Sequence, residues 1–291
     1  SVDRAGRAQV LDTSWIAQVS SFGVSPDGRR LVASVVAQGE QQLWLKDLPA
    51  GPLSKFTFDA GDHFRPTWSA DGKVIRYVHG NGASFEMLEK NAAGTGDARR
   101  LPYGDHQVVD GVPARDGSWF VMRVGAGDTL GALLALRLGV DSVARTLGAG
   151  GIYKQGLALS PDARFIAYQS AASGQPEVYV SPFPDVGAAR WQVSRNTGME
   201  PRWSPTGNEL YYVTDRDEFM AASYTTQPSF AVTATRTLFD VAGYGRDGGY
   251  HAYEPTNDGR FLMLRNETFP GDLVLVTNWF AELRARLAAG K

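Results

Sequence analysis

The chain contains no cysteine among its 291 residues, which excludes disulfide bonds and thiolate metal or redox chemistry. Acidic and basic residues nearly cancel, and a formal net charge of −2 gives no electrostatic reason to expect nucleic acid or an anionic membrane as a partner. No apolar run reaches the ~18–20 residues that a membrane-spanning helix needs. A chain without cysteine is compatible with either side of a membrane, so composition alone does not give its location.

Common catalytic signatures are also missing. The sequence has no Gly-x-Ser-x-Gly elbow, no His-Glu-x-x-His motif and no kinase glycine-rich or catalytic loop. The run Gly243–Gly248 matches a dinucleotide-binding pattern, but the residues after it do not favour the helix that this motif requires. Asp215–Glu218 lacks the glycine and distal glutamate of a calcium loop, and a hairpin turn explains it. We therefore expect no enzyme activity, no catalytic residues, no metal and no cofactor.

A short phrase recurs six times along the chain. It first reads Ser25-Pro26-Asp27-Gly28 and continues into an apolar run. Proline and Asp-Gly favour a tight turn, and the next five to seven residues alternate or run apolar as a strand does. The glycine position falls at residues 28, 72, 117, 163, 207 and 259, with gaps of 44, 45, 46, 44 and 52 residues. A period near 45 residues that carries strand signals is typical of β-propeller blades.

We therefore predict one all-β domain over residues 1–291, a six-bladed β-propeller with about four antiparallel strands per blade. A strand at residues 8–12 is expected to join the last blade and close the ring. Residues 130–140 have a composition that also suits a helix, but the register of the neighbouring blades favours a strand. Residues 279–288 have the apolar spacing of a short C-terminal helix. The expected blades span residues 19–58, 64–102, 108–147, 155–194, 199–240 and 250–277.

Three parts of the sequence resemble a known family of propellers. Val2–Arg7 is similar to the end of a Trp-Val-Asp-Arg-x-Gly opening, and Asn278–Leu283 matches an Asn-Trp-Phe-x-Glu-Leu ending. A central run matches at Glu177–Pro184, Trp191–Ser194 and Glu200–Ser204. These stretches resemble the WD40-like β-repeat of the TolB family. They resemble still more closely the C-terminal propeller of bacterial membrane-anchored serine/threonine protein kinases.

The resemblance implies a non-catalytic sensor that binds a ligand or a protein on the extracytoplasmic, periplasmic side of a bacterial membrane. It also implies a kinase domain and a membrane helix upstream of Ser1, so that only this upstream segment would contact the membrane. We expect no nucleic-acid partner, and a monomer as a fragment. Two alternatives stay open: a propeller enzyme of the lyase or hydrolase type acting at the channel mouth, and a TolB-like scaffold that docks protein partners.

Candidate binding residues come from the segments that precede the repeated phrase. In a propeller the first strand of each blade lines the central channel, and polar loop residues converge at its mouth. Imidazoles gathered there could hold zinc or a carboxylate, but no pair has metal-ligand spacing, so we favour a small polar ligand or a peptide end. The candidate residues are Asp62, His63, Arg65, His106, Gln107, Tyr153, Lys154, Glu200, Arg202, Tyr250, His251 and Glu254.

Two other repeated residue types have structural explanations. The aspartates of the phrase are expected to bond the backbone of their own turns rather than to take part in catalysis. These are Asp27, Asp71, Asp116, Asp162 and Asp258. The strand tryptophans, among them Trp68 and Trp203, are expected to pack between blades.

Overall fold

The computed structural model describes residues 1–12, 15, 17–37, 39–82, 84–125, 131–147, 154–246 and 250–266, and the structural statements below concern these residues. They form the strands β1 to β22 and no helix. Within this part of the chain there is accordingly no helix that could cross a bilayer. The helix expected at residues 279–288 lies outside the described residues.

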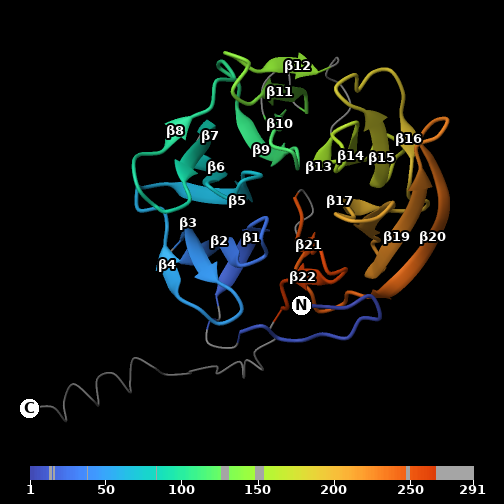
Figure 1. Cartoon of the computed structure of the whole chain (residues 1–291), viewed down its shortest axis with the longest axis horizontal. Coiled ribbons are helices and arrows are strands. Elements are labelled where there is room, and N and C mark those ends of the chain that lie inside the picture. The colour runs from blue at the N-terminus through green and yellow to red at the C-terminus, as the bar shows by residue number, and fades with distance from the viewer. Residues whose placement is uncertain are drawn as a thin grey trace, which may run out of the picture.

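The strands form six antiparallel sheets that stand in a ring around a central space (Figure 1). The first sheet contains β1 (Gln18–Val24), β2 (Arg30–Ala37), β3 (Glu40–Asp47) and β4 (Leu53–Lys55). The second contains β5 (Asp62–Trp68), β6 (Val74–Asn81), β7 (Ser84–Asn91) and β8 (Arg99–Arg100). The third contains β9 (Val108–Pro113), β10 (Trp119–Val124), β11 (Leu133–Arg137) and β12 (Arg145–Leu147).

The remaining three sheets follow the same order, with the first strand nearest the axis (Figure 1). The fourth contains β13 (Gln155–Leu159), β14 (Phe165–Ser170), β15 (Glu177–Pro182) and β16 (Trp191–Gln192). The fifth contains β17 (Met199–Trp203), β18 (Glu209–Val213), β19 (Glu218–Thr225) and β20 (Ala231–Asp240). The sixth contains β21 (Tyr253–Pro255) and β22 (Phe261–Met263). The expected all-β propeller is confirmed, and the ambiguous segment at 130–140 contains strand β11.

The repeated phrase forms the turn between the first and second strands of a sheet. In the first copy, the Ser25 hydroxyl donates to Asp27 Oδ1 at 2.6 Å, and the Arg29 amide donates to the same oxygen at 3.1 Å. Ser69 and Asp71 repeat the hydroxyl contact at 2.6 Å, and Ser160 and Asp162 repeat it at 2.7 Å. Hydrogen bonds from the Ser25 hydroxyl and the Arg29 amide lower the pKa of Asp27. The structural role expected for these aspartates is confirmed.

One copy of the turn is strained. Gly28, Gly72, Gly117 and Gly259 occupy the fourth turn position with φ between 69° and 77°. Ala163 stands at the same position in the fourth copy and has φ 52°. A side chain with a Cβ is disfavoured in this left-handed region, whereas glycine adopts it readily. The fourth turn therefore keeps the repeated geometry at a conformational cost.

Replacing Ala163 with Gly should relieve this strain and raise the free energy of unfolding by about 0.5–1 kcal/mol. The reverse substitution, Gly28→Ala, should lower it by a similar amount, because a Cβ built at Gly28 meets no atom within 4 Å and only the backbone strain would act. Urea unfolding of both variants and the unmodified chain measures the two effects. A destabilised Ala163→Gly protein would show that the turn does not carry this strain.

Neighbouring sheets are joined by separate hydrophobic clusters, one at each junction of the ring. Between the second and third sheets, for example, Val78 and Met87 pack with Phe120 and Leu134. The junction between the last and first sheets is made by Phe22 and its neighbours in the first sheet, with Leu262 and Leu264 packed against them. Because each sheet covers its face with the next sheet, the hydrophobic core is distributed around the ring.

Tryptophans add a repeated hydrogen bond to two of these junctions. Trp68, at the end of β5, donates its indole N–H to the Gly23 carbonyl of β1 at 3.1 Å. Trp203, at the end of β17, donates to the Ala158 carbonyl of β13 at 3.0 Å. Both side chains are buried. The expectation that these tryptophans pack between blades is confirmed. Their indole hydrogen bonds also set the position of each inner strand along the axis relative to the inner strand of the preceding sheet.

The N-terminal segment joins the last sheet. Val2 is buried and exchanges two backbone hydrogen bonds with Phe261 of β22, at 2.7 and 2.8 Å. The expected closing strand at residues 8–12 does not make this contact, and of these residues Ala8 only forms an isolated bridge back to Val2. The pairing residue is thus Val2, because its buried side chain fits the sheet edge, whereas Val10 is 58% exposed.

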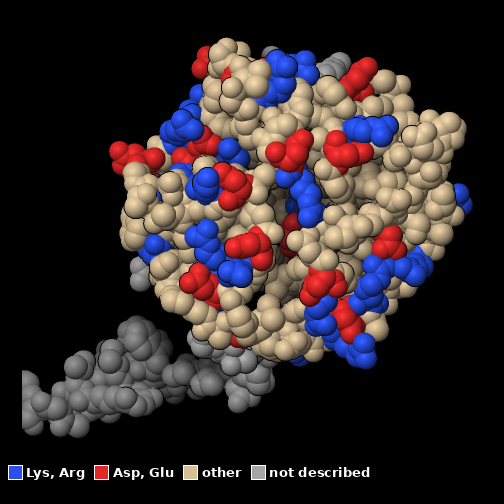
Figure 2. Space-filling model, viewed as in Figure 1, with Lys and Arg blue, Asp and Glu red and all other residues tan. Residues whose placement is uncertain are grey.

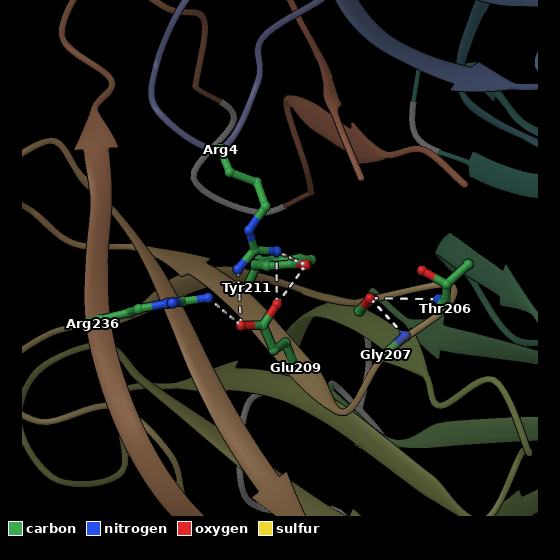
Figure 3. Close-up of polar contacts among 7 residues, drawn as sticks. Arg4, Thr206, Gly207, Glu209, Tyr211 and Arg236 are labelled. Atoms are coloured by element: carbon green, nitrogen blue, oxygen red, sulfur yellow. Dashed lines mark hydrogen bonds and ion pairs between the residues drawn. The ribbon is translucent and has the colours of Figure 1, made fainter. Parts of the chain in front are cut away.

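An ion pair fixes this segment to the fifth sheet as well (Figure 3). Both terminal nitrogens of Arg4 contact the Glu209 carboxylate, at 2.8 and 2.9 Å, and Arg4 Nη1 also donates to the Tyr211 hydroxyl at 2.9 Å. Arg236 donates to the same carboxylate from the outer strand β20 at 2.8 Å. The segment therefore ties the sixth sheet to the fifth.

Burial alone would raise the pKa of Glu209, but hydrogen bonds from Arg4 and Tyr211 and the charges of Arg4 and Arg236 outweigh it and lower the pKa below its usual value. A carboxylate with a lowered pKa stabilises the fold above its unfolded-state pKa, and this stabilisation is lost as the pH falls through the folded-state pKa. The closing contact should therefore weaken in acid.

Replacing Arg4 with Ala should lower the free energy of unfolding by about 1 kcal/mol at neutral pH, because a partly exposed bidentate pair is weaker than a buried one. Arg7→Ala is the control: its side chain is 83% exposed and pairs with Asp3 in the same turn, so little change is expected. The difference between Arg4→Ala and the unmodified chain should shrink in acid, as the pH falls through the lowered pKa of Glu209 and its carboxylate becomes protonated. Urea titrations over this pH range measure it. A difference that stays constant in acid would contradict the role given to Glu209.

Candidate functional site

The inner strands present equivalent residues around the axis. Counting four positions back from the first residue of each phrase gives one residue per sheet. Neighbours in this set contact one another: the Arg65 amide donates to the Ser21 hydroxyl at 2.9 Å, and the Arg65 guanidinium lies 3.8 Å from the Asp110 carboxylate. The Ala252 amide donates to Glu200 Oε2 at 3.0 Å. The set consists of Ser21, Arg65, Asp110, Gly156, Glu200 and Ala252.

Three members of this set have a left-handed backbone. Arg65, Gly156 and Glu200 have φ of 52°, 57° and 55°, and each lies where the pairing of its strand shifts register. Such bulges bend a strand and redirect side chains, and non-glycine residues in this conformation cost about 1–3 kcal/mol. The recurrence in three sheets shows that the inner strands require the bulge at this height.

An aromatic and charged cluster occupies the axis beside this set. The Arg65 guanidinium lies over the Tyr250 ring, 5.6 Å from its centre, and the Tyr250 and His251 rings are 3.9 Å apart. Arg202 reaches the same place from β17, where it donates to His251 Nδ1 and to the Leu157 carbonyl. Glu254 of β21 lies 3.5 Å from Arg202 Nε and 3.6 Å from His251 Nε2.

The cluster sets the protonation of its members. Burial and the nearby charges of Arg202 and Arg65 lower the pKa of His251 well below its usual value, so the imidazole is neutral. Since a guanidinium can only donate, Nδ1 of His251 accepts and Nε2 carries the proton. Burial raises the pKa of Glu254, although the Arg202 charge opposes this shift. The cluster is thus a mutually bonded polar floor in which Arg202 has only 11% of its side chain exposed.

A buried ion pair supports this floor from the third sheet. Asp110 and Arg123 are both buried, and Arg123 Nε donates to Asp110 Oδ2 at 2.8 Å. Arg65 also approaches Asp110, so one carboxylate faces two guanidinium groups. Sequence reasoning missed Asp110. Its position relative to the phrase, equivalent to those of Arg65 and Glu200, was the signal that could have found it.

A pocket of about 620 Å³ lies above the floor. Arg202, Tyr250, His251 and Glu254 belong to its lining, and its walls are formed by the ends of the inner strands and by the repeated turns that follow them. Figure 2 shows a hollow at the centre of the ring with basic atoms inside it and acidic atoms deeper down. Other lining residues include Val24, Pro26, Pro66, Trp68, Pro113, Leu159, Pro161, Trp203, Pro205 and Leu262.

Arg115 spans the mouth of this pocket. It belongs to the turn after β9 in the third sheet, yet its two terminal nitrogens donate to the Pro205 carbonyl at 3.0 Å and to Asn257 Oδ1 at 2.9 Å. These acceptors lie in the turns of the fifth and sixth sheets, so the side chain crosses the ring. Both acceptors are neutral, and Arg115 forms no ion pair with an acidic residue in the described part of the chain.

The structure brings only part of the expected binding residues together. Arg202, Tyr250, His251 and Glu254 line the pocket, Arg65 joins them through Tyr250, and Glu200 is buried beside them. The pocket opens at the end of the inner strands where the repeated turns lie. Most of the expected loop residues come from the opposite end, where the chain enters these strands, which is why they do not line it.

Those other residues have separate contacts. Asp62 accepts from the Gln41 amide at 2.9 Å, and Gln107 Oε1 accepts from the Phe85 amide at 2.6 Å. Lys154 lies over the Tyr168 ring at 5.6 Å, and burial lowers its pKa, with the Arg190 charge adding to the effect. His63 is buried away from the pocket, and His106 is half-buried in the loop before β9. Tyr153 lies outside the described residues.

Comparison with known proteins shows which class of fold this is. No protein-family model and no curated protein matches the sequence. A putative TolB from Agrobacterium tumefaciens has a similar structure, with a TM-score of 0.62, 17% identity, and 81% of this chain and 84% of that chain covered. TolB from Acinetobacter baumannii gives 0.60 and 16%, over 80% of this chain and 56% of the other. A chain of the nidogen/laminin complex gives 0.57 and 11%, over 75% and 80%.

At these identities the likeness is one of fold. The chain has a TolB-like β-propeller fold, which was expected from the repeated phrase and the resemblance in sequence.

Proposed function

We propose that this propeller is a non-catalytic binding module that receives a carboxylate-bearing end of a polypeptide in its axial pocket. Arg115 is the observation that carries the proposal. Its guanidinium is held across the pocket mouth by a carbonyl and an amide oxygen, both neutral. Hydrogen bonds between a guanidinium and a carboxylate are roughly twice as strong as neutral ones and are often bidentate. An arriving carboxylate would therefore replace two weaker acceptors.

The walls of the pocket suit the rest of a peptide. Proline, tryptophan and leucine side chains from several sheets offer apolar surface, and a pocket of about 620 Å³ has room for a few side chains. The polar floor offers charged and polar groups to a guest, since Arg202 bonds His251 and lies 3.5 Å from the Glu254 carboxylate. Glu254 has a raised pKa there, and it is the group through which the enzyme alternative would act.

The fold neighbours are compatible with this role. One of the matching chains comes from a complex of two proteins, nidogen and laminin. Two others are TolB proteins. The fold supports a scaffold that docks a protein partner best. A sensor role is a more specific version of this binding function.

We further propose that the propeller is the periplasmic sensor domain of a bacterial serine/threonine kinase. This proposal rests on the sequence runs at Val2–Arg7, Glu177–Pro184 and Asn278–Leu283. Reading the complete gene tests it directly: a kinase domain followed by one membrane helix should be encoded ahead of Ser1. A gene that encodes another domain there would refute the kinase assignment and leave the binding role intact.

The binding role predicts a preference for free carboxyl ends. A synthetic library of short peptides with free carboxyl ends should contain binders, and amidation of the same peptides should weaken binding by at least about tenfold, as expected for the loss of a charge-assisted bond. The substitution Arg115→Met should have the same effect on the selected peptides. Fluorescence polarisation with labelled peptides measures both changes.

Arg145→Met provides the matched control. Arg145 lies in the outer strand β12 and stacks on Trp119 at 5.2 Å, away from the pocket, so its replacement should leave peptide affinity unchanged. Affinity that survives both amidation and Arg115→Met would overturn the proposal. Turnover of a lyase or hydrolase substrate that depends on Glu254 would instead favour the enzyme alternative, since Glu254 is the pocket acid with a raised pKa.

A further inference from the structure

Two histidines lie opposite each other on neighbouring strands, away from the axial pocket. His63 of β5 pairs directly with His79 of β6, and their rings stack with centres 4.8 Å apart and planes 23° apart. Residues paired directly across an antiparallel ladder point to the same face of the sheet. His63 is completely buried and His79 is half-buried, so the pair runs from the interior toward the surface.

The loop that leads into β5 brings a carboxylate to the same place. Asp59 Oδ2 lies 3.1 Å from His63 Nε2, and His79 Nε2 lies 3.1 Å from the Ala60 carbonyl. Both imidazoles therefore turn their Nε2 atoms toward the 59–61 loop. One donor atom from each of Asp59, His63 and His79 lies within 4.8 Å of the others.

The loop is held in this shape by contacts of its own. The Gln42 side-chain amide donates to the Asp59 carbonyl at 3.0 Å and to the Gly61 carbonyl at 3.2 Å. Gln42 Oε1 in turn accepts from the Thr57 hydroxyl at 2.7 Å, and both side chains are buried. Gly61 has φ 99°, and a Cβ there would lie 2.8 Å from His79 Nε2. Only glycine therefore allows the loop to approach the imidazole so closely.

We propose that Asp59, His63 and His79 form a binding site for a divalent transition metal of the zinc class. Two imidazole nitrogens and one carboxylate oxygen are a common set of protein ligands for Zn²⁺, with a further position left for water. Zinc bonds of ~2.0–2.2 Å place neighbouring tetrahedral ligands roughly 3.3–3.6 Å apart. The 3.1 Å contact between His63 and Asp59 is close to this spacing, and rotation of the exposed Asp59 and the half-buried His79 would bring in the third ligand.

The ligand set rests on geometry. His63 Nε2 faces the Asp59 carboxylate, and the stacked ring of His79 presents its own Nε2 to the same loop. The contacts of Gln42 supply outer support for the carboxylate loop, as outer groups do in known metal sites.

This site is separate from the proposed peptide site. None of Asp59, His63 and His79 lines the axial pocket. Asp59 lies in the loop that leads from the first sheet to the second, and His63 and His79 lie in β5 and β6 of the second sheet. A bound metal would fasten that junction and would leave at least one coordination position for water or for a side chain of a partner protein.

The test is a calorimetric titration of the chain, without a histidine tag and after treatment with a chelator, with Zn²⁺. We expect one equivalent to bind and the unfolding temperature to rise with Zn²⁺ concentration. Asp59→Asn and His79→Ala should each weaken binding by at least about tenfold. Both side chains reach the surface, and metal-free variants that unfold at the temperature of the unmodified chain show that the loss is not a folding defect.

His106→Ala is the matched control. His106 is a half-buried histidine in the loop before β9, so its replacement should leave the zinc affinity of the chain unchanged. Arg115→Met should also bind zinc as the unmodified chain does, which separates this site from the axial pocket. The proposal is overturned if no Zn²⁺ binds, if Asp59→Asn and His79→Ala bind it as before, or if His106→Ala weakens binding as much as they do.

Discussion

The whole ring depends on the burial of each sheet face against the next. A row of such sheets would leave two apolar faces in water unless its ends met, and here they meet where Phe22 of the first sheet packs with Leu262 of the last. Val2 supplies a backbone partner for β22, and Arg4 links the same segment to Glu209 of the fifth sheet. The axial pocket depends on this closure, because its lining comes from several sheets of the ring.

The sequence predicted the fold well because its signals were local and repeated. A turn such as Ser25–Gly28 specifies its own geometry through side-chain bonds to its backbone, so recognising it six times was enough to predict a propeller. The closing residue was harder to find. Val2 is one apolar residue without a pattern around it, and its partner, Phe261 of β22, is far away in the sequence.

The candidate binding residues separate into two groups for a similar reason. Arg202, His251 and Glu254 line the pocket because they lie on inner strands or next to them, whereas Asp62 and Gln107 accept backbone hydrogen bonds at the other end of those strands. Arg115 was missed because its importance comes from two acceptors 90 and 142 residues away. His79 was set aside because it precedes no phrase, yet the register of β5 and β6 places it opposite His63. Long-range pairings of this kind leave no trace in local spacing.

The equivalent positions around the axis have a consequence for recognition. The backbone repeats from sheet to sheet, but Arg65, Asp110, Gly156 and Glu200 give each sheet a different group at the same height. A scaffold with near rotational symmetry would offer a guest several interchangeable orientations. Here the chemical differences remove that degeneracy, because the charges of Arg65, Asp110 and Glu200 give the electric field along the axis one preferred angular setting, although these side chains lie beneath the pocket and not in its lining. Single substitutions at these positions would turn that field without changing the strands.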